Sequence, residues 1–225
     1  MENLVKNGLV GNSFDAVFCI VGIIVCVIIP YLLGSINFAV IISKNGYKDD
    51  VRTHGSGNAG ATNMLRVHGK GAAALTFLGD FLKSAISTFL ALLIMPGDEF
   101  AYIAAFFCIL GHAYPVFFKF KGGKGVVVTA AAVLILNPLV FLICIAVFIL
   151  IVLSTKYVSL GSIIAAILFP ILNFKLFAYS VPMPIKTIFS VLIALFIIFL
   201  HRKNIVRLFN GTESKFGKNK PQKLK

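Results

Sequence analysis

Residues 50–66 hold the densest group of side chains able to bind phosphate. The segment, DVRTHGSGNAGATNMLR, combines arginines and glycines with hydroxyl and amide side chains. Glycines let several backbone N–H groups approach one anion, and arginine adds a bidentate contact to phosphate oxygens. An ordinary solvated loop is the plainer interpretation, but it does not need this density of anion-binding groups. The candidate anion-binding residues are Arg52, Gly55, Ser56, Gly57, Asn58, Gly60, Thr62, Asn63 and Arg66.

A second candidate anion site lies at residues 111–125, GHAYPVFFKFKGGKG. Its KGGKG end precedes an apolar run and is expected to open a helix, whose free N–H groups and positive dipole end favour an anion. The alternative is that the lysines only mark the cytoplasmic side and cap the helix, but three glycines exceed what topology requires. The candidate anion-binding residues are His112, Lys121, Gly122, Gly123, Lys124, Gly125 and Thr129.

The third polar segment, residues 201–215, reads HRKNIVRLFNGTESK and follows directly after an apolar run. His201 and Asn204 are three residues apart, which places both side chains on one face of a helix. This spacing is the specific part of the segment. The alternative is a basic run that ends membrane insertion and extends its charges to lipid headgroups.

Two nucleotide-binding motifs are excluded. The glycines of residues 55–60 match GxGxxG, with Asp80 twenty residues later, but a dinucleotide site needs a strand before the glycines. Residues 48–52 are too polar for a buried strand, and Asp80 lies in an apolar run. KGGKG is not a Walker A loop, because Phe118 stands where the first glycine belongs.

Polar residues also occur inside the apolar runs. Ser35 lies in Gly34-Ser35-Ile36-Asn37, near the expected cytoplasmic end of the first run. Asp80 and Lys83 are three residues apart within another run, where charges are costly and usually pair or serve function. A structural ion pair and a pair that faces substrate both remain open.

The elements that position these residues are expected to be membrane-spanning helices. The chain has 225 residues, of which 59% are hydrophobic and 13% charged, and its mean hydropathy is +0.96. A soluble domain of this size could not bury that much apolar surface. The formal net charge is +13, and the basic residues lie between and after the apolar runs. This arrangement favours anionic lipid headgroups and anionic substrates over nucleic acid as binding partners. The four cysteines lie in apolar runs, so neither a disulfide nor a metal site is expected.

The sequence predicts an all-α membrane protein with seven transmembrane helices, because a spanning helix needs about 20 apolar residues. The first run is thirty residues long, so its last third leaves the hydrocarbon or bends, with Pro30 as a candidate bend. Asn137-Pro138 is expected to divide another long run into two helices. Within a membrane domain at 14–201, the predicted spans are 14–43, 71–95, 100–118, 126–136, 139–155, 159–179 and 185–200.

The seven-span layout places all three polar segments on one side of the membrane. Seventeen of the 21 lysines and arginines fall on that side, which identifies it as cytoplasmic. A short segment at 1–13 is then outside the cell, and the basic tail at 202–225 is cytoplasmic.

In order, GSGNAGATNMLR, GHAYPVFFKFKGGKGVVVT and HRKNIVRLFNGTESK resemble the three signature loops of the bacterial acyl-phosphate:glycerol-3-phosphate acyltransferase family. The resemblance covers about residues 15–216 and departs from the family at Asn37, where a proline is usual. It implies transfer of a fatty acyl group from acyl phosphate to the sn-1 hydroxyl of glycerol 3-phosphate. The products are lysophosphatidic acid and inorganic phosphate, and no cofactor or metal is implied. It also implies a bacterial inner-membrane location and, as a candidate partner, the enzyme that makes acyl phosphate.

The resemblance also implies roles for individual residues. The 55–63 loop is expected to handle phosphate and the reacting carbonyl, and 122–125 to hold the phosphate of glycerol 3-phosphate. The implied catalytic residues are Ser35, Arg52, Ser56, Asn58, His201 and Asn204, and the residues expected to brace the structure are Asp80, Lys83, Arg207 and Glu213.

The signature of soluble-type acyltransferases, a histidine followed five residues later by an aspartate, is absent, so a different mechanism is expected. Positioning of the substrates and electrostatic stabilisation are expected to dominate the reaction. A substrate phosphate oxygen is the expected proton acceptor, with His201 as the alternative general base. Two other classes of membrane protein are alternatives. A transporter of a phosphate-bearing solute would place paired polar groups near the midplane. A non-catalytic protein that binds anionic lipid would not need three glycine-rich loops.

Overall fold

The apolar runs fold as helices, which satisfy backbone N–H and C=O groups internally where lipid offers no partners. The structure, a computed structural model, describes residues 16–177 and 184–217, and its regular elements there are all helical. In chain order they are α2 (Ala16–Ile23), η1 (Ile24–Ile28), α3 (Ile29–Ser35), α4 (Phe38–Tyr47), η2 (Val51–Thr53), α5 (Ala61–Val67), α6 (Lys70–Ile94), α7 (Glu99–Ala113), η3 (Val116–Phe118), α8 (Val126–Leu136), α9 (Pro138–Thr155), α10 (Val158–Phe177), α11 (Pro184–Leu200) and α12 (Arg202–Phe209).

Five helical stretches among the described residues are long and apolar enough to cross a membrane. A sixth is added if α11 and α12, which meet at a 57° bend, are taken as one span. Helix α8 has 11 residues and is shorter than a span. The all-helical class is confirmed, whereas the count of seven spans stays a prediction. The predicted segment 1–13, the start of span 14–43, the end of span 159–179 and tail residues 218–225 lie outside the described residues.

The first apolar run is interrupted at Ile36–Asn37 and not at Pro30. Pro30 lies near the start of α3, which continues directly from the π-helical turn η1. Asn37 then caps α4, because its side chain accepts a hydrogen bond from the Val40 backbone N–H at 3.1 Å. The residue that replaces the usual family proline therefore starts a new helix.

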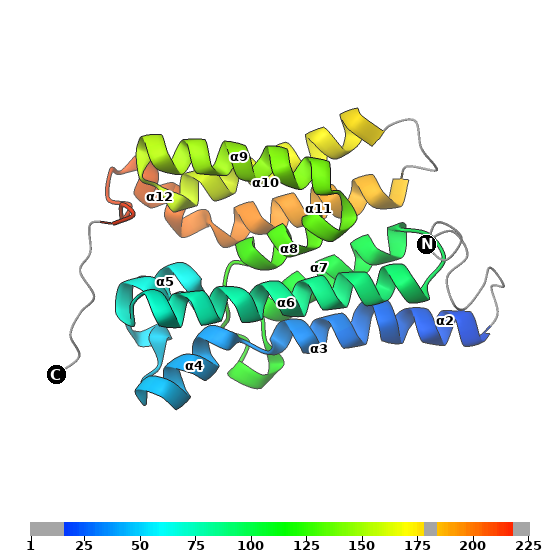
Figure 1. Ribbon diagram of the computed structural model, residues 1–225, viewed down its shortest axis with the longest axis horizontal. Helices are drawn as coiled ribbons and strands as arrows, with labels where there is room; N and C mark the ends of the chain where they lie inside the picture. The colour runs from blue at the N-terminus through cyan, green and yellow to red at the C-terminus, as the bar shows by residue number, and fades with distance from the viewer. Residues whose placement is uncertain (1–15, 178–183, 218–225) are drawn as a thin grey trace.

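The helices lie roughly along one axis; the first and third polar segments lie at one end, and the second, between α7 and α8, lies nearer the middle of the bundle (Figure 1). Helices α5 and α12 mark that end, while α2 begins near the other (Figure 1). Asn137 separates α8 from α9 and caps α9 by accepting from the Val140 N–H at 3.2 Å. This is the division predicted from Asn137-Pro138.

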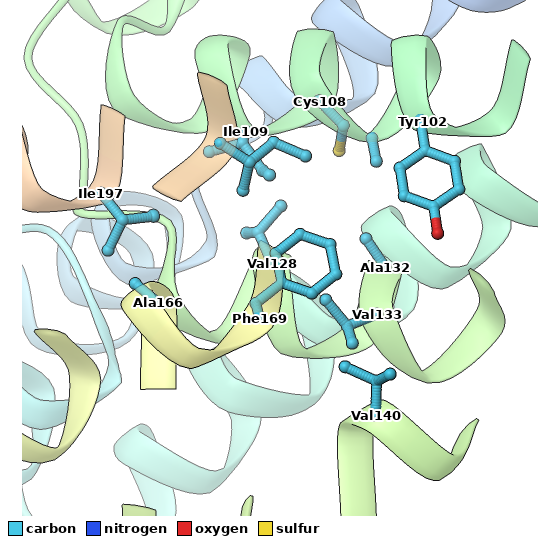
Figure 2. Close-up of a cluster of buried hydrophobic side chains, with 12 residues drawn as sticks. Tyr102, Cys108, Ile109, Val128, Ala132, Val133, Val140, Ala166, Phe169 and Ile197 are labelled. Atoms are coloured by element: carbon cyan, nitrogen blue, oxygen red, sulfur yellow. The ribbon is translucent and has the colours of Figure 1, made fainter. Parts of the chain in front are cut away.

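The largest apolar core surrounds the short helix α8. Figure 2 shows Val128, Ala132 and Val133 of α8 facing side chains of α7, α9, α10 and α11, including Ile109 and Phe169. Packing on several sides fixes α8 in the bundle, and with it the KGGKG segment just before α8.

Helices α3 and α7 approach closely through two glycines. A Cβ added to Gly34 would lie 2.1 Å from the Cys108 carbonyl oxygen, and one added to Gly111 would lie 2.2 Å from the Tyr31 carbonyl oxygen. Small residues permit such contact between membrane helices. Ser35 and His112, next to these glycines, are therefore held at fixed positions.

Candidate active site

A polar cavity lies where the three predicted segments meet. Its empty volume, including the open mouth, is about 1130 Å³. Helices α5, α6, α8, α9 and α10 contribute to its walls together with the third segment. The predicted residues that line it are Ser56, Asn58, Gly60, Thr62, Asn63, Arg66, Asp80, His112, Lys124, Gly125, His201, Asn204 and Glu213.

Asn63 shapes the first wall of the cavity. Its side-chain oxygen accepts from the Ser56 N–H at 2.9 Å, and its amide nitrogen donates to the carbonyls of Val51 and His54, each at 3.0 Å. Gly55 lies in the left-handed region at φ +59°, outside the cavity lining. Asn63 and Gly55 thus fold the loop that presents Ser56.

Lys124 and Glu213 connect the second and third segments. The Lys124 ammonium donates to the Asn204 side-chain oxygen, and the Asn204 amide donates to Glu213 Oε1 at 2.7 Å. Glu213 also accepts from Ser159 Oγ and Arg207 Nε, each at 2.7 Å. Burial raises the pKa of Glu213, but these hydrogen bonds outweigh burial and hold its pKa below the ordinary value. The Glu213 carboxylate is therefore ionised, and it holds Arg207 directly and Lys124 through Asn204.

The cavity carries more positive than negative charge. Lys124 and Arg66 line it, and Arg207 lies beside it on Glu213. Burial lowers the pKa of Lys124 to about 8, with further lowering from Arg207 and Arg66 and partial compensation by Glu213. The lining carboxylate of Asp80 is paired with Lys83, so four cations at or beside the cavity face two carboxylates, and the excess positive charge favours entry of an anion.

His201 is buried and lines the cavity next to Lys124. Its Nδ1 lies 2.8 Å from the Ile197 carbonyl oxygen, which can only accept a hydrogen bond. Nδ1 therefore carries the proton, and in the neutral ring Nε2 is left as an acceptor. This tautomer allows His201 to orient a substrate hydroxyl or to remove its proton.

Lys83 secures the end of α3. Its ammonium donates to the carbonyls of Gly34 at 2.9 Å and Ile36 at 2.6 Å, and lies 2.8 Å from Asp80 Oδ1. His112 Nδ1 is 3.0 Å from the same ammonium and must accept from it. The buried pair therefore has structural contacts, while Asp80 and His112 also line the cavity.

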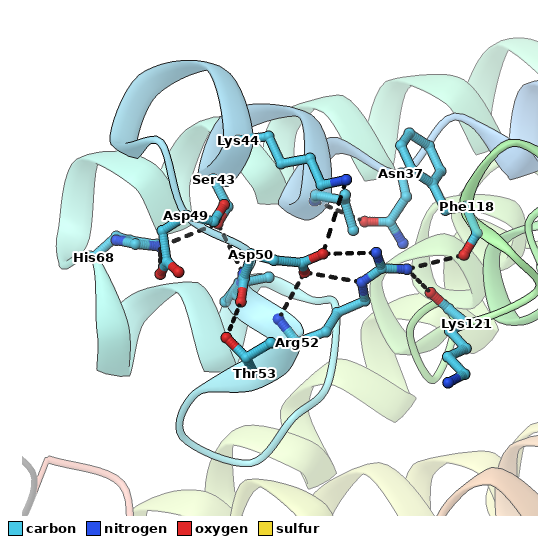
Figure 3. A network of polar contacts seen from close by, with 12 residues as sticks. Asn37, Ser43, Lys44, Asp49, Asp50, Arg52, Thr53, His68, Phe118 and Lys121 are labelled. Atoms are coloured by element: carbon cyan, nitrogen blue, oxygen red, sulfur yellow. Dashed lines mark hydrogen bonds and ion pairs between the residues drawn. The ribbon is translucent and has the colours of Figure 1, made fainter.

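Two predicted catalytic residues lie outside the cavity lining. Arg52 pairs with Asp50 through Nε and Nη2, at 2.9 and 2.7 Å, and lowers the Asp50 pKa to about 2 (Figure 3). Arg52 Nη1 donates to the carbonyls of Phe118 at 2.9 Å and Lys121 at 3.1 Å. The Ser35 hydroxyl is fully buried and accepts from the Val116 N–H at 3.3 Å. The predicted phosphate-binding residues outside the lining are Gly55, Gly57, Lys121, Gly122, Gly123 and Thr129, and the predicted bracing residues outside it are Lys83 and Arg207.

Gly123 is needed for close packing of the KGGKG segment. A Cβ there would lie 2.1 Å from His112 Nε2 and 2.7 Å from the Ala59 carbonyl oxygen. We expect Gly123→Ala to destabilise the protein by about 1–3 kcal/mol and to lower activity, because overpacking displaces the loop. Denaturation in micelles and an activity assay measure both effects.

Gly46→Ala is the matched control, since a Cβ at this position in α4 meets nothing within 4 Å. We expect it to be neutral or stabilising by up to about 1 kcal/mol. Equal losses in the two variants would show that the close approach at Gly123 is unimportant.

An apolar groove adjoins the polar cavity and was not predicted. Its empty volume is about 840 Å³, and it is lined by α6, α8, α9, α10 and Ile197 of α11. The two spaces share five lining residues and therefore adjoin: Phe77, Val126, Val127, Phe148 and Ser162. Thr129 lines the groove. Hydropathy gives no signal for it, since groove-lining and lipid-facing residues are equally apolar.

Ser159 is another site residue that sequence reasoning missed. It lines the cavity and donates to Glu213, and Ser162 lies three residues later at the same end of α10. The spacing of these serines on one helical face was the available signal.

A family model described as glycerol-3-phosphate acyltransferase matches residues 24–211. The chain belongs to the glycerol-3-phosphate acyltransferase family. It is 46% identical over 190 residues to a glycerol-3-phosphate acyltransferase of Thermoanaerobacter pseudethanolicus, covering 84% of this chain and 93% of that relative. It is 43% identical over 206 residues to one of Clostridioides difficile, covering 88% and 97%.

Solved structures of a family member agree with this assignment. The crystal structure of PlsY (YgiH), an integral membrane glycerol 3-phosphate acyltransferase in its glycerol 3-phosphate form, matches with a TM-score of 0.81 at 38% identity. The match covers 88% of this chain and 96% of that one. The lysophosphatidic acid form matches with a TM-score of 0.78. This glycerol-3-phosphate acyltransferase family member is therefore an integral membrane protein, and its three polar segments border one cavity.

Proposed function

We propose that the protein transfers a fatty acyl group from acyl phosphate to the sn-1 hydroxyl of glycerol 3-phosphate. The products are lysophosphatidic acid and inorganic phosphate, and the reaction lies at the cytoplasmic face of a bacterial cell membrane. The proposal includes the seven-span topology that the charge distribution predicts. The observation that carries it is that a cationic cavity directly adjoins an apolar groove, with five lining residues in common.

The two adjoining spaces fit the two parts of an acyl phosphate. The acyl chain occupies the apolar groove, and the charged groups of both substrates stay in the polar cavity. The junction includes Val126 and Val127, the first residues of α8. Their N–H groups are at a helix N-terminus, which favours the charge of a phosphate or of a developing oxyanion.

The cations Lys124 and Arg66 serve the chemistry in two ways. They bring two negatively charged substrates together, and they stabilise the charge of the departing phosphate. The glycerol 3-phosphate hydroxyl attacks the acyl carbonyl, and its proton passes to a phosphate oxygen while His201 Nε2 orients the hydroxyl. If His201→Gln removed turnover but left glycerol 3-phosphate binding intact, His201 would be the general base instead.

The direct test incubates purified protein in lipid with acyl phosphate and labelled glycerol 3-phosphate. We expect equal amounts of lysophosphatidic acid and inorganic phosphate. Acyl-CoA in place of acyl phosphate is the donor control and is expected to give no product. Folded protein that makes no lysophosphatidic acid would contradict the proposal.

The activity is expected to fall as the pH rises through about 8. The pKa of Lys124 is about 8 because the side chain is buried, so its ammonium loses charge over this range. Glycerol 3-phosphate is already a dianion there, since the second pKa of a phosphate monoester is about 6. We therefore expect kcat/KM to decrease above pH 8.

The control for this prediction is Lys124→Arg, since arginine keeps its charge. It is expected to move the alkaline decrease to higher pH, even if its different geometry lowers activity throughout. An unchanged alkaline profile would show that Lys124 does not cause the decrease. Donor hydrolysis without enzyme is subtracted at each pH.

A further inference from the structure

Residues 116–121, VFFKFK, form an exposed aromatic and basic loop between α7 and α8. Val116, Phe117 and Phe120 expose 41%, 58% and 56% of their surfaces, and Lys119 and Lys121 are also exposed. None of these five residues lines the polar cavity or the apolar groove. In Figure 1 the green segment between α7 and α8 extends beyond α3 at the lower edge of the bundle. These five side chains therefore border neither of the two spaces of the candidate site.

The loop adopts a backbone conformation that is unusual for its residues. Lys119 and Phe120 both lie in the left-handed backbone region, at φ 58° and 56°, which residues other than glycine seldom adopt. The turn is closed by the Phe120 N–H, which donates to the Pro115 carbonyl at 3.0 Å. Strained residues persist where their surroundings enforce the conformation and often mark functional segments.

Arg52 helps to hold Lys119 and Phe120 in this backbone conformation. Its Nη1 bridges the carbonyls of Phe118 and Lys121, on the two sides of the strained pair (Figure 3). Asp50 holds the rest of the guanidinium by a bidentate contact. The loop is therefore fixed in place, and it is fixed to the first anion-binding segment.

We propose that the 116–121 loop contacts the surface of the membrane. Phe117 and Phe120 insert at the boundary between headgroups and acyl chains, and Lys119 and Lys121 bind anionic lipid headgroups. Helix α7 ends at Ala113, so the loop begins three residues after the end of an apolar helix. Aromatic residues collect at this level of membrane proteins, and nearby lysines are attracted to anionic lipid.

This placement gives the lipid contact a consequence for the site. Gly122, Gly123 and Lys124 follow the loop directly, and the Gly122 N–H donates to the Ala113 carbonyl at 3.1 Å. The chain between the end of α7 and Lys124 is thus held by α7, by Arg52 and by the lipid surface. The inference concerns lipid contact alone and does not rest on the proposed acyl transfer.

The chain has no tryptophan, so Phe117→Trp introduces a single fluorescent reporter. The variant is reconstituted in vesicles that contain phosphatidylglycerol and phosphatidylcholine. We expect blue-shifted emission, strong quenching by lipids brominated near the headgroup, and little quenching by acrylamide. Leu82→Trp is the reference, because Leu82 is exposed at the middle of α6 and should respond to lipids brominated deep in the acyl chains.

Charge dependence is tested by adding Lys119→Gln to the Phe117→Trp protein. We expect the removal of one lysine to reduce the difference in quenching between anionic vesicles and vesicles of phosphatidylcholine alone. Phe120→Trp gives an independent reporter if Phe117→Trp does not fold. Red-shifted emission that acrylamide quenches and brominated lipid does not would overturn the proposal. That result would leave the loop in water, available to a protein partner.

Discussion

Replacing Lys124 by methionine is expected to lower kcat/KM by about 10²–10³-fold, a typical loss when one electrostatic group is removed from an active site. Lys124 lines the cationic cavity beside the start of α8 and donates to Asn204. Methionine preserves most of the apolar stem but removes the charge that stabilises the departing phosphate. The rate of lysophosphatidic acid formation in detergent, measured for both this variant and its control, provides the comparison.

The fold should tolerate Lys124→Met. Asn204 keeps its hydrogen bond to Glu213 at 2.7 Å, and Glu213 keeps Arg207 and Ser159. The carboxylate is therefore not left unpaired. Unfolding in micelles should occur under nearly the same conditions as for the unaltered protein.

Lys119→Met is the matched control, because Lys119 is an exposed lysine of the same segment outside the cavity lining. Assayed in detergent, where the lipid surface is absent, it should retain most of its activity. Comparable losses in both variants would mean that the segment needs general positive charge. Full activity of Lys124→Met would remove the basis for placing the phosphate chemistry in this cavity.

Hydropathy predicted the helices well because lipid requires internal hydrogen bonding along the whole span. The predicted range 71–95 corresponds to α6 at Lys70–Ile94, and 139–155 corresponds to α9 at Pro138–Thr155. The break at Ile36–Asn37 was missed because hydropathy hardly registers one polar residue in a long apolar run. The available signal was the capping preference of Asn37.

The site was harder to predict than the helices because a motif does not reveal which way its side chains point. Arg52 belongs to the densest anion-binding motif, yet its guanidinium contacts Asp50 and two carbonyls more than sixty residues away. Arg66 of the same segment lines the cavity. Local composition therefore identified the loop, whereas tertiary contacts decided which of its arginines faces the cavity. The catalytic role first expected for Arg52 stays a proposal.

The Asp80–Lys83 pair offers the largest expected effect on stability. Lys83→Met leaves the buried Asp80 carboxylate without its ammonium and frees the carbonyls of Gly34 and Ile36. Breaking a buried ion pair by removing one partner typically costs about 3–5 kcal/mol. Lys70→Met, at the exposed start of the same helix, is expected to change stability by no more than about 0.5 kcal/mol.

A double-mutant cycle separates the ion pair from the carbonyl contacts. Asp80→Asn combined with Lys83→Met removes both charges, so it should destabilise the protein by less than the sum of the single variants, with a coupling of about 1–3 kcal/mol. The residual loss reports the freed carbonyls at the end of α3. Additive effects, measured by unfolding in micelles, would show that the pair does not act as a unit. The loss in the double variant would then be assigned to the end of α3, where Lys83 joins the first membrane helix to the wall of the cavity.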